Sequence, residues 1–509
     1  MIRPFRNGSA LRLFVLGAIL ATTASCAPRS FAQSDDLAAK SQQAKEFMAE
    51  GKFAEAIPLY RELNQAVPNN PGLLLNLGMA LHMAGDEGKA IAPLEAAVKL
   101  DPKLPPAWLF LGAARLQLGE TLSAINALKT LLRLQPGHQD ARSMLAGALL
   151  SLNRDIEAAE EYRKLADLDP GSSAAWYGLG LSYEALSVRA FSQLEKAAPE
   201  SAYWLALVAE ARFHEQQFAS AFYLYRQAQE NLPSLRGIHD AVAEIYRKTG
   251  HGDWAAIEEE KERQLLPPDC ARDRLECDFQ AGNYRELIAT AEGQTTPESF
   301  YWRTHAYNQL ALGAYTRLGQ LPSSASSEEL IAKIESKRRQ YAEAAKHWEE
   351  ALKFSPSSAH IKEELAISLF QAADLDRARE LFQELLKSNP QSTRLNYYLG
   401  DVLLKSQKPA EALPFLQKAV EHDPGLLPAH ASLAHTYLAL GQADKAIPHL
   451  KAALSVDEDG SLHYELGRAY QAHGQPALAR QMLKQYQEIH SKQESEKQSL
   501  NQEMQITAP

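Results

Sequence analysis

The sequence predicts an all-α fold built as a solenoid of antiparallel helix pairs, and three observations support this prediction. Hydrophobic residues make up 45% and charged residues 23% of the chain, which is typical of a folded protein. Apolar residues recur at helical spacing. A fixed period of about 34 residues indicates stacked repeats that bury their apolar faces against one another. Prolines mark this period in three runs: Pro68, Pro102, Pro136, Pro170; Pro199, Pro233, Pro267; and Pro356, Pro390, Pro424.

Residues 71–104 show how one unit is expected to form two helices. The first helix is predicted by an apolar stripe at helical spacing: Leu74, Leu77, Gly78 and Leu81. Gly85 ends it. The second helix is predicted by a similar stripe: Ala90, Leu94 and Ala97. The small residues Gly78 and Ala90 allow the two helices to cross closely, and Pro102 stops the second helix because proline opposes continuation.

The pattern resembles the tetratricopeptide repeat family over about residues 37–490. Its fragments recur in phase, for example as Trp108, Leu111, Gly112, Gly119, Ala124, Leu128 and Pro136; as Trp176, Leu179, Gly180 and Tyr183; and as Tyr341, Ala344, Trp348, Ala351 and Pro356. The resemblance implies a right-handed superhelical solenoid of about a dozen antiparallel helix pairs. It also implies that the first helix of each repeat lines a concave face that receives a peptide or a helix of a partner protein.

Two places break the period and suggest the domain order. The step from Pro170 to Pro199 is shorter than the others, so the unit there is expected to have a clipped second helix at 187–195. The step from Pro267 to Pro356 is much longer and holds a predicted long helix at 298–318. The predicted order has five parts: a signal peptide at 1–32, an N-terminal array at 33–267, an irregular helical segment at 268–324, a C-terminal array at 325–490 and a polar tail at 491–509. The tail is expected to be disordered after its first turn.

Residues 1–32 are expected to be an export signal. Basic residues precede the apolar run at 13–21, and small residues follow it, in the order of a bacterial secretory signal. The run is too short to span a bilayer. Cleavage is expected after Ala32. The alternative is lipidation at Cys26, which would anchor the protein to a membrane. Either route predicts a location in the periplasm or cell envelope.

Cys270 and Cys277 form an even pair once Cys26 is removed or acylated. In an oxidising compartment they could form a disulfide. Two cysteines at this spacing on one helix would be about 10 Å apart, so a disulfide requires a chain turn between them. Two free thiols are the alternative.

Composition and motifs argue against several classes of function. The net charge is −10, and residues 1–32 carry four arginines and no acid, so the rest of the chain is still more acidic. Such a chain is expected to repel nucleic acid. Gly178 and Gly180 lie inside a predicted helix rather than a phosphate loop, and His214 lacks the second histidine of a zinc-protease helix because Phe218 stands there. We expect no catalytic residues, no metal site and no cofactor.

What remains is binding of proteins or peptides. The resemblance places apolar groove residues on first helices near the N-terminus: Leu75, Met79, Leu109 and Ala113. It places polar and aromatic groove residues near the C-terminus: Tyr397, Asp401, His435, Tyr464 and Arg468. Aromatic residues and arginine are common binding anchors. The predicted function is a non-catalytic scaffold that binds partner segments in this groove. The alternative is an envelope-anchored lipoprotein or structural subunit that acts through its outer surface.

Overall fold

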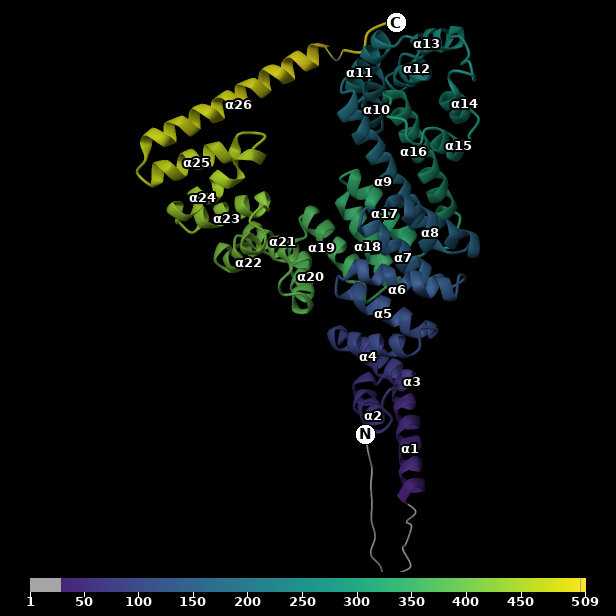
Figure 1. The fold of residues 1–509 in the computed structure, drawn as a ribbon. Helices are drawn as coiled ribbons and strands as arrows, with labels where there is room; N and C mark the ends of the chain where they lie inside the picture. The colour runs from purple at the N-terminus through teal and green to yellow at the C-terminus, as the bar shows by residue number, and fades with distance from the viewer. Residues whose placement is uncertain (1–28, 504) are drawn as a thin grey trace, which may run out of the picture. The chain divides into compact units, whose positions relative to one another are not determined.

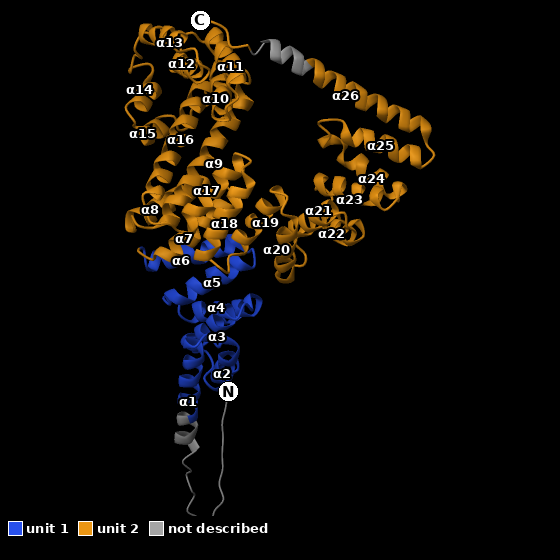
Figure 2. Cartoon of the chain, turned by 180° about the vertical axis from the view of Figure 1, so that it is seen from behind, with its two compact units in different colours: residues 1–136 blue, residues 137–509 orange. Residues whose placement is uncertain are grey.

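The computed structural model describes residues 29–503 and 505–509. Over these residues the chain forms 26 α-helices and one short 3₁₀ helix and no strand, which confirms the all-α prediction (Figure 1). It divides into two compact units, residues 1–136 and 137–509 (Figure 2). The boundary therefore falls inside the predicted N-terminal array, 33–267.

The first unit consists of three helix pairs. Their bounds are α1 Arg29–Ala49, α2 Phe53–Ala66, α3 Pro71–Met83, α4 Glu87–Leu100, α5 Pro105–Gln117 and α6 Thr121–Leu134. Asn70 caps α3 by accepting hydrogen bonds from the amides of Gly72 and Leu73, which would otherwise lack partners. Gly85 (φ +78°) follows α3 in the left-handed conformation that reverses the chain into α4.

The second unit holds the remaining helices. Its first part comprises α7 Gln139–Ser151, α8 Asp155–Leu168, α9 Ser173–Ala197, α10 Ala202–His214, α11 Phe218–Asn231, α12 Ile238–Lys248, α13 Gly252–Gln264, α14 Arg274–Gln280, α15 Tyr284–Thr290 and α16 Pro297–Gly319. Its second part comprises α17 Ala325–Lys337, α18 Tyr341–Phe354, α19 Ala359–Gln371, α20 Leu375–Ser388, α21 Thr393–Lys405, α22 Pro409–His422, α23 Leu427–Ala439, α24 Ala443–Ala453, the 3₁₀ helix η1 Leu454–Val456, α25 Ser461–Ala472 and α26 Pro476–Glu503. One continuous apolar cluster runs from α17 to α26.

Regular repeats share one close contact between their two helices. A glycine of the first helix packs against a leucine of the helix that follows it, and a β-carbon on the glycine would overlap or crowd that leucine. The pairs are Gly78 with Leu94, Gly112 with Leu128, Gly400 with Leu416 and Gly467 with Leu483. The glycine lets the two helix axes approach closely.

Gly180 of α9 makes the same kind of contact with a residue much farther along the chain. A β-carbon there would overlap the ring of Tyr315 on α16, and six helices lie between the two along the sequence. Tyr315 donates a hydrogen bond to Glu184 (2.8 Å), and Ser187 donates to Asn308 (2.6 Å). Because the order along α9 runs opposite to that along α16, the two helices are antiparallel. The C-terminal half of α16 is therefore the second helix of the repeat that α9 begins.

One prediction at the break between Pro170 and Pro199 is wrong. The clipped second helix at 187–195 does not exist, because α9 runs unbroken over 25 residues. No glycine or proline interrupts residues 184–197, and contact with α16 buries the extension. The predicted irregular helical segment at 268–324 contains α14, α15 and α16. Helix α17 packs directly on α9, as α23 packs on α21, so the array passes from α9 and α16 straight to α17.

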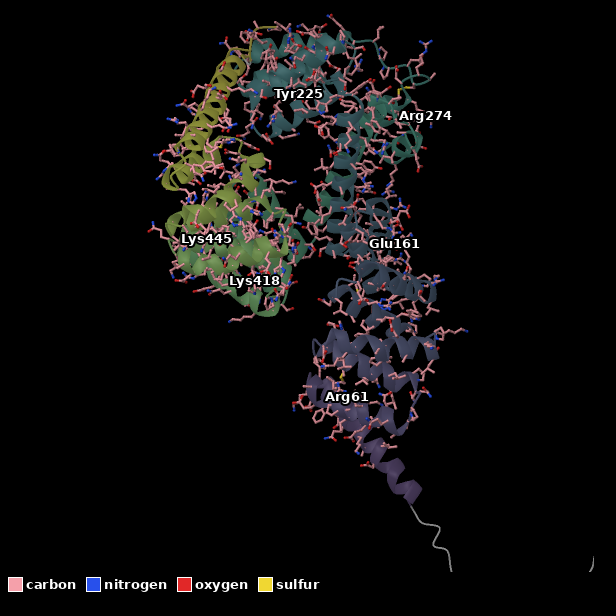
Figure 3. The ribbon with its side chains drawn as sticks, turned by 60° about the vertical axis from the view of Figure 1, so that its left-hand side comes forward. Arg61, Glu161, Tyr225, Arg274, Lys418 and Lys445 are labelled. Carbon is pink, nitrogen blue, oxygen red and sulfur yellow. A yellow bond between two sulfur atoms is a disulfide. The ribbon has the colours of Figure 1, made fainter. Side chains whose placement is uncertain are left out.

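The extra stretch of chain forms what we call the inserted module, which comprises α10 to α15 and the facing halves of α9 and α16. Figure 1 shows α9 and α16 side by side, with α14 and α15 next to α16 and α10 to α13 toward the top of the view. The module has its own apolar cluster, in which Tyr246, Leu287 and Phe300 are buried. Figure 3 labels Tyr225 and Arg274, two residues of this module.

The polar tail also differs from its prediction. Helix α26 continues to Glu503, so residues 491–503 are helical rather than disordered. Beyond it, Ile506 packs against the apolar cluster of the inserted module. Tyr246 of α12 donates a hydrogen bond to the carbonyl oxygen of Thr507 (2.6 Å).

Candidate functional site

The predicted C-terminal groove residues lie on three first helices, α21, α23 and α25. Asp401 of α21 is buried and accepts a hydrogen bond from Ser432 of α23 (2.9 Å), while Lys405 Nζ lies 3.5 Å from its other oxygen. Tyr397 lies one turn before Asp401 and is half-buried. Burial, with Asp401 nearby, raises the pKa of Tyr397, so this phenol is neutral.

His435 of α23 joins this group to α25. Its Nε2 lies 2.7 Å from Glu465 Oε2, and the Glu465 carboxylate raises the pKa of His435 above its ordinary value of 6.5. His435, Glu465 and Arg468 line a cavity of about 440 Å³. The Arg468 guanidinium carbon lies 6.0 Å from the ring centre of Tyr464, a residue that is 43% exposed.

These side chains form what we call the polar strip: Tyr397, Asp401, Ser432, His435, Tyr464, Glu465 and Arg468. Acidic and basic side chains alternate along it, from Asp401 through His435 and Glu465 to Arg468. The strip can bind the polar groups of a peptide and stack against its side chains. Ser432 and Glu465 were missed in the sequence, although both lie on the same predicted helices.

The four predicted N-terminal groove residues lie on α3 and α5 of the first unit. Leu75, Met79, Leu109 and Ala113 are all half-buried. Leu75 packs against the apolar cluster that contains Leu94 and Leu111. Part of its role is therefore to hold the repeats together.

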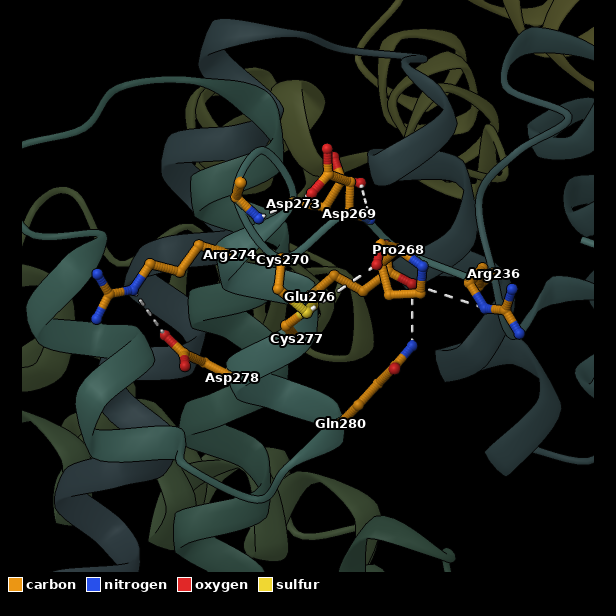
Figure 4. Close-up of a disulfide and its surroundings, with 11 residues drawn as sticks. Arg236, Pro268, Asp269, Cys270, Asp273, Arg274, Glu276, Cys277, Asp278 and Gln280 are labelled. Atoms are coloured by element: carbon orange, nitrogen blue, oxygen red, sulfur yellow. Dashed lines mark hydrogen bonds and ion pairs between the residues drawn. A yellow bond between two sulfur atoms is a disulfide. The ribbon is translucent and has the colours of Figure 1, made fainter. Parts of the chain in front are cut away.

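Cys270 and Cys277 form a disulfide, with 5.7 Å between their Cα atoms (Figure 4). Cys270 lies in the turn before α14 and Cys277 lies within α14, so the chain reverses between them as the prediction required. Asp269 shapes this turn: its carbonyl accepts from the amide of Arg272 (2.8 Å), and its side chain accepts from the amide of Ala271 (3.0 Å). The disulfide fixes the middle of α14 to the preceding turn.

The inserted module forms a larger cavity of about 620 Å³, which is open to solvent on one side. Aromatic side chains line it: Phe213, Tyr225, Phe279, Tyr301 and Trp302. Acidic side chains line it too: Glu210, Asp240, Glu244, Glu262 and Glu276. Arg236, His214 and His305 are also in the wall. Three of the lining residues are on α14, which the disulfide anchors: Glu276, Phe279 and Gln280.

The predicted signal peptide and Cys26 lie largely or wholly outside the described residues, which begin at Arg29. Helix α1 begins there, so the expected cleavage after Ala32 falls in its first turn. Within the described part of the chain, every helix is too short or too polar to cross a membrane.

Comparison with known families agrees with the packing of the regular repeats. A tetratricopeptide repeat profile matches residues 41–105, 111–173, 330–391 and 363–426, and a second profile of this repeat matches 403–461. Together the matches cover just over half of the chain. The chain belongs to the tetratricopeptide repeat family. Stacked helical repeats of this kind present extended binding surfaces, which supports a role as a protein–protein interaction scaffold.

Several solved structures resemble part of this tetratricopeptide protein. MamA from residue 41 onward, from Desulfovibrio magneticus RS-1, has 25% sequence identity and a TM-score of 0.31 over 33% of this chain and 96% of its own. YrrB, described as a tetratricopeptide repeat protein with an unusual peptide-binding site, has 24% identity and a TM-score of 0.29 over 32% of this chain and 85% of its own. No curated protein sequence matches the chain.

The matched ranges of these two profiles stop at residue 173 and resume at residue 330, and the inserted module lies between them. The cavity residues lie there and were missed, because they come from several helices and make no motif along the chain. Two features of the sequence could have indicated this cavity: the repeat period is broken here, and aromatic and acidic residues are locally frequent.

Proposed function

We propose that this protein is an exported, non-catalytic scaffold that binds a segment of a partner protein along the polar strip of α21, α23 and α25. The observation that carries the proposal is the continuity of this strip. Side chains from three successive first helices meet in it through Asp401 with Ser432 and through His435 with Glu465. A strip of this kind is already ordered before binding, so little conformational entropy is lost when a partner binds.

Export to the cell envelope is part of the proposal. It is supported by the signal-like residues 1–32 and by the disulfide between Cys270 and Cys277, since structural disulfides persist mainly in oxidising compartments. Mass spectrometry of the mature N-terminus tests it. A chain that begins at Gln33 indicates a free envelope protein, and an acylated Cys26 indicates a membrane-anchored one. An intact Met1 in protein from the native cells would contradict export.

Crosslinking in living cells tests the strip. A photoreactive amino acid placed at Tyr464 is expected to capture a partner, and Tyr397→Ala with Arg468→Ala is expected to reduce capture at least about tenfold. The control is Glu421→Ala with Asp444→Ala, two exposed positions on the second helices α22 and α24. Figure 3 labels Lys418 and Lys445 on these same two helices. Equal capture by both variants would favour the outer surface instead.

A further inference from the structure

We propose that the cavity of the inserted module binds an organic cation, an alkylammonium or guanidinium group such as the end of a lysine or arginine side chain. This site is separate from the polar strip and from the first helices of the regular repeats. Four features of the described side chains lead to it: charge, an unpaired buried oxygen, aromatic faces and size.

The cavity wall carries more acidic than basic side chains. Five carboxylates line the cavity, and Arg236 is the one lysine or arginine among its lining residues. Its guanidinium already donates to the carbonyl oxygens of Leu265 (3.1 Å) and Leu266 (2.9 Å). It also lies 3.8 Å from both Glu262 and Glu276. Arg236 is thus held in place between Glu262 and Glu276. Outside the cavity lining, Arg247 (2.7 Å) and Lys248 (3.7 Å) pair with Glu244, and His214 lies 3.8 Å from Glu210. The excess negative charge of the wall therefore lies at Asp240 and at Glu262 with Glu276.

Glu262 supplies the second observation. This residue is only 8% exposed, and its Oε1 accepts a hydrogen bond from the amide of Gly237 (3.0 Å). Its Oε2 is buried and has no hydrogen-bond partner. Leaving a buried carboxylate oxygen unpaired costs free energy, which a cationic N–H donor inside the cavity would recover.

Glu276 and Glu210 both contribute carboxyl groups to the wall. Burial raises the pKa of Glu276. Arg236 acts to lower this pKa, but the nearby carboxyl groups of Asp273, Glu298 and Glu262 raise it again. A cation beside Glu276 would relieve this repulsion. Burial also opposes ionisation of Glu210, but a hydrogen bond with His214 holds its pKa below the usual value. Glu210 is therefore a carboxylate.

Aromatic rings give the cavity faces that attract cations. Tyr301 and Trp302 lie edge to face at 4.9 Å between ring centres, and Phe279 lies 5.2 Å from Trp302. Aromatic faces beside carboxylates are suited to ammonium and guanidinium groups. Burial lowers the pKa of His305, so its ring is neutral and does not act as an internal cation.

The size of the cavity points to an organic cation rather than a metal ion. A volume of about 620 Å³ is typical of sites for organic ligands. Metal ions need several ligands that converge, and no group of three histidine, cysteine or acidic side chains does so among the described residues.

The test measures binding of small probes to the full mature chain with its disulfide intact. The probes are Nα-acetyl-lysine amide and Nα-acetyl-arginine amide, which carry only the side-chain charge. Nα,Nε-diacetyl-lysine amide is the neutral control, and n-butylamine is the free amine without a peptide backbone. Binding is followed by saturation-transfer NMR and by tryptophan fluorescence, because Trp302 lines the cavity.

We expect saturable binding of the lysine or arginine probe with a dissociation constant on the order of 1 mM. The diacetylated probe should bind at least about tenfold more weakly, because it lacks the charge. Tighter binding of the peptide-like probes than of n-butylamine would identify a partner's side chain as the source. Equal affinity for n-butylamine and the peptide-like probes would show that the cavity also binds free amines.

Two variants localise the site. Glu262→Gln and Glu276→Gln keep the side-chain shape but remove charge, and each should weaken binding at least about tenfold. The matched control is Glu260→Gln, an exposed residue of the same helix as Glu262 that does not line the cavity. Circular dichroism melting shows whether each variant is folded. If Glu262→Gln does not fold, Glu276→Gln alone tests the site. Equal affinity for charged and acetylated probes, or unchanged affinity in the folded variants, would overturn the proposal.

Discussion

The repeat of α21 and α22 and the repeat of α9 and α16 use the same packing rule over very different chain lengths. In the first, Gly400 meets Leu416 of the very next helix; in the second, Gly180 meets Tyr315, and α10 to α15 lie between them along the chain. The contact is the same in kind, but a module with its own core stands between the two helices. A solenoid repeat can therefore accept an insertion between its helices if the second helix still returns to the glycine.

The largest loss of stability is expected when the contact between Gly180 and Tyr315 is blocked. Gly180→Ala places a β-carbon against the Tyr315 ring, and overpacking of this kind costs about 1–3 kcal/mol in the free energy of unfolding. Urea unfolding followed by fluorescence measures the loss, and hydrogen exchange should show it in α9 and α16.

Gly313→Ala is the matched control, because it lies in α16 with open space around its position. It should leave stability unchanged or raise it slightly, since alanine favours helix. Adding Tyr315→Ala to Gly180→Ala should cost less than the two separate losses combined, because both act on one contact. Additive losses, or equal losses at Gly180 and Gly313, would contradict the assignment of α16 as the second helix.

A smaller, local effect should follow from opening the disulfide. Cys270→Ser with Cys277→Ser removes a short loop closure worth about 2 kcal/mol. Hydrogen exchange should quicken in α14 and α15, while the regular repeats α21 to α24 stay protected. Wild-type protein treated with dithiothreitol should behave like the double variant. Unchanged exchange in α14 would mean that its packing alone holds it in place.

The smallest expected effect is a different pH dependence of stability in the polar strip and in the inserted module. Glu465 raises the pKa of His435 in the polar strip, whereas burial lowers the pKa of His305 in the inserted module. His435 thus contributes stability below about pH 6.5 that is lost as pH rises through its folded pKa. His305 contributes stability above about pH 6.5 that is lost as pH falls through its folded pKa.

NMR titration of the imidazole ring protons measures both histidines, with His435→Gln and His305→Gln used for assignment. The His435 midpoint should lie above the ordinary value of 6.5 and the His305 midpoint below it. Glu465→Gln should lower the His435 midpoint and leave that of His305 unchanged. Two histidines with the same midpoint would remove this difference between the regions.

The regular repeats could be predicted because their signals are local. Pro102, Gly78 and Leu94 all lie within one repeat period, so spacing alone indicates both helices and the turn. The first helices of successive repeats present equivalent faces, and this is why Asp401 and His435 could be assigned to one surface. Their binding role stays a prediction.

The pairing of α9 with α16 could not be predicted in this way. Tyr315 lies beyond the reach of a single repeat period, and the continuous helical pattern after Tyr183 has no glycine or proline that would signal its length. The cavity was hidden for the same reason, because Glu210, Glu262 and Tyr301 are brought together only by the packing of the inserted module.

The contact between Tyr246 and Thr507 changes how the end of the array can open. In a linear stack of repeats the terminal helices fray first, because each repeat is held only by its neighbours. Here the residues just beyond α26 are held against α12, 261 positions earlier in the chain. Fraying from the C-terminus must first release Ile506 and Thr507. The last repeats are thus tied to the inserted module by the residues that follow α26.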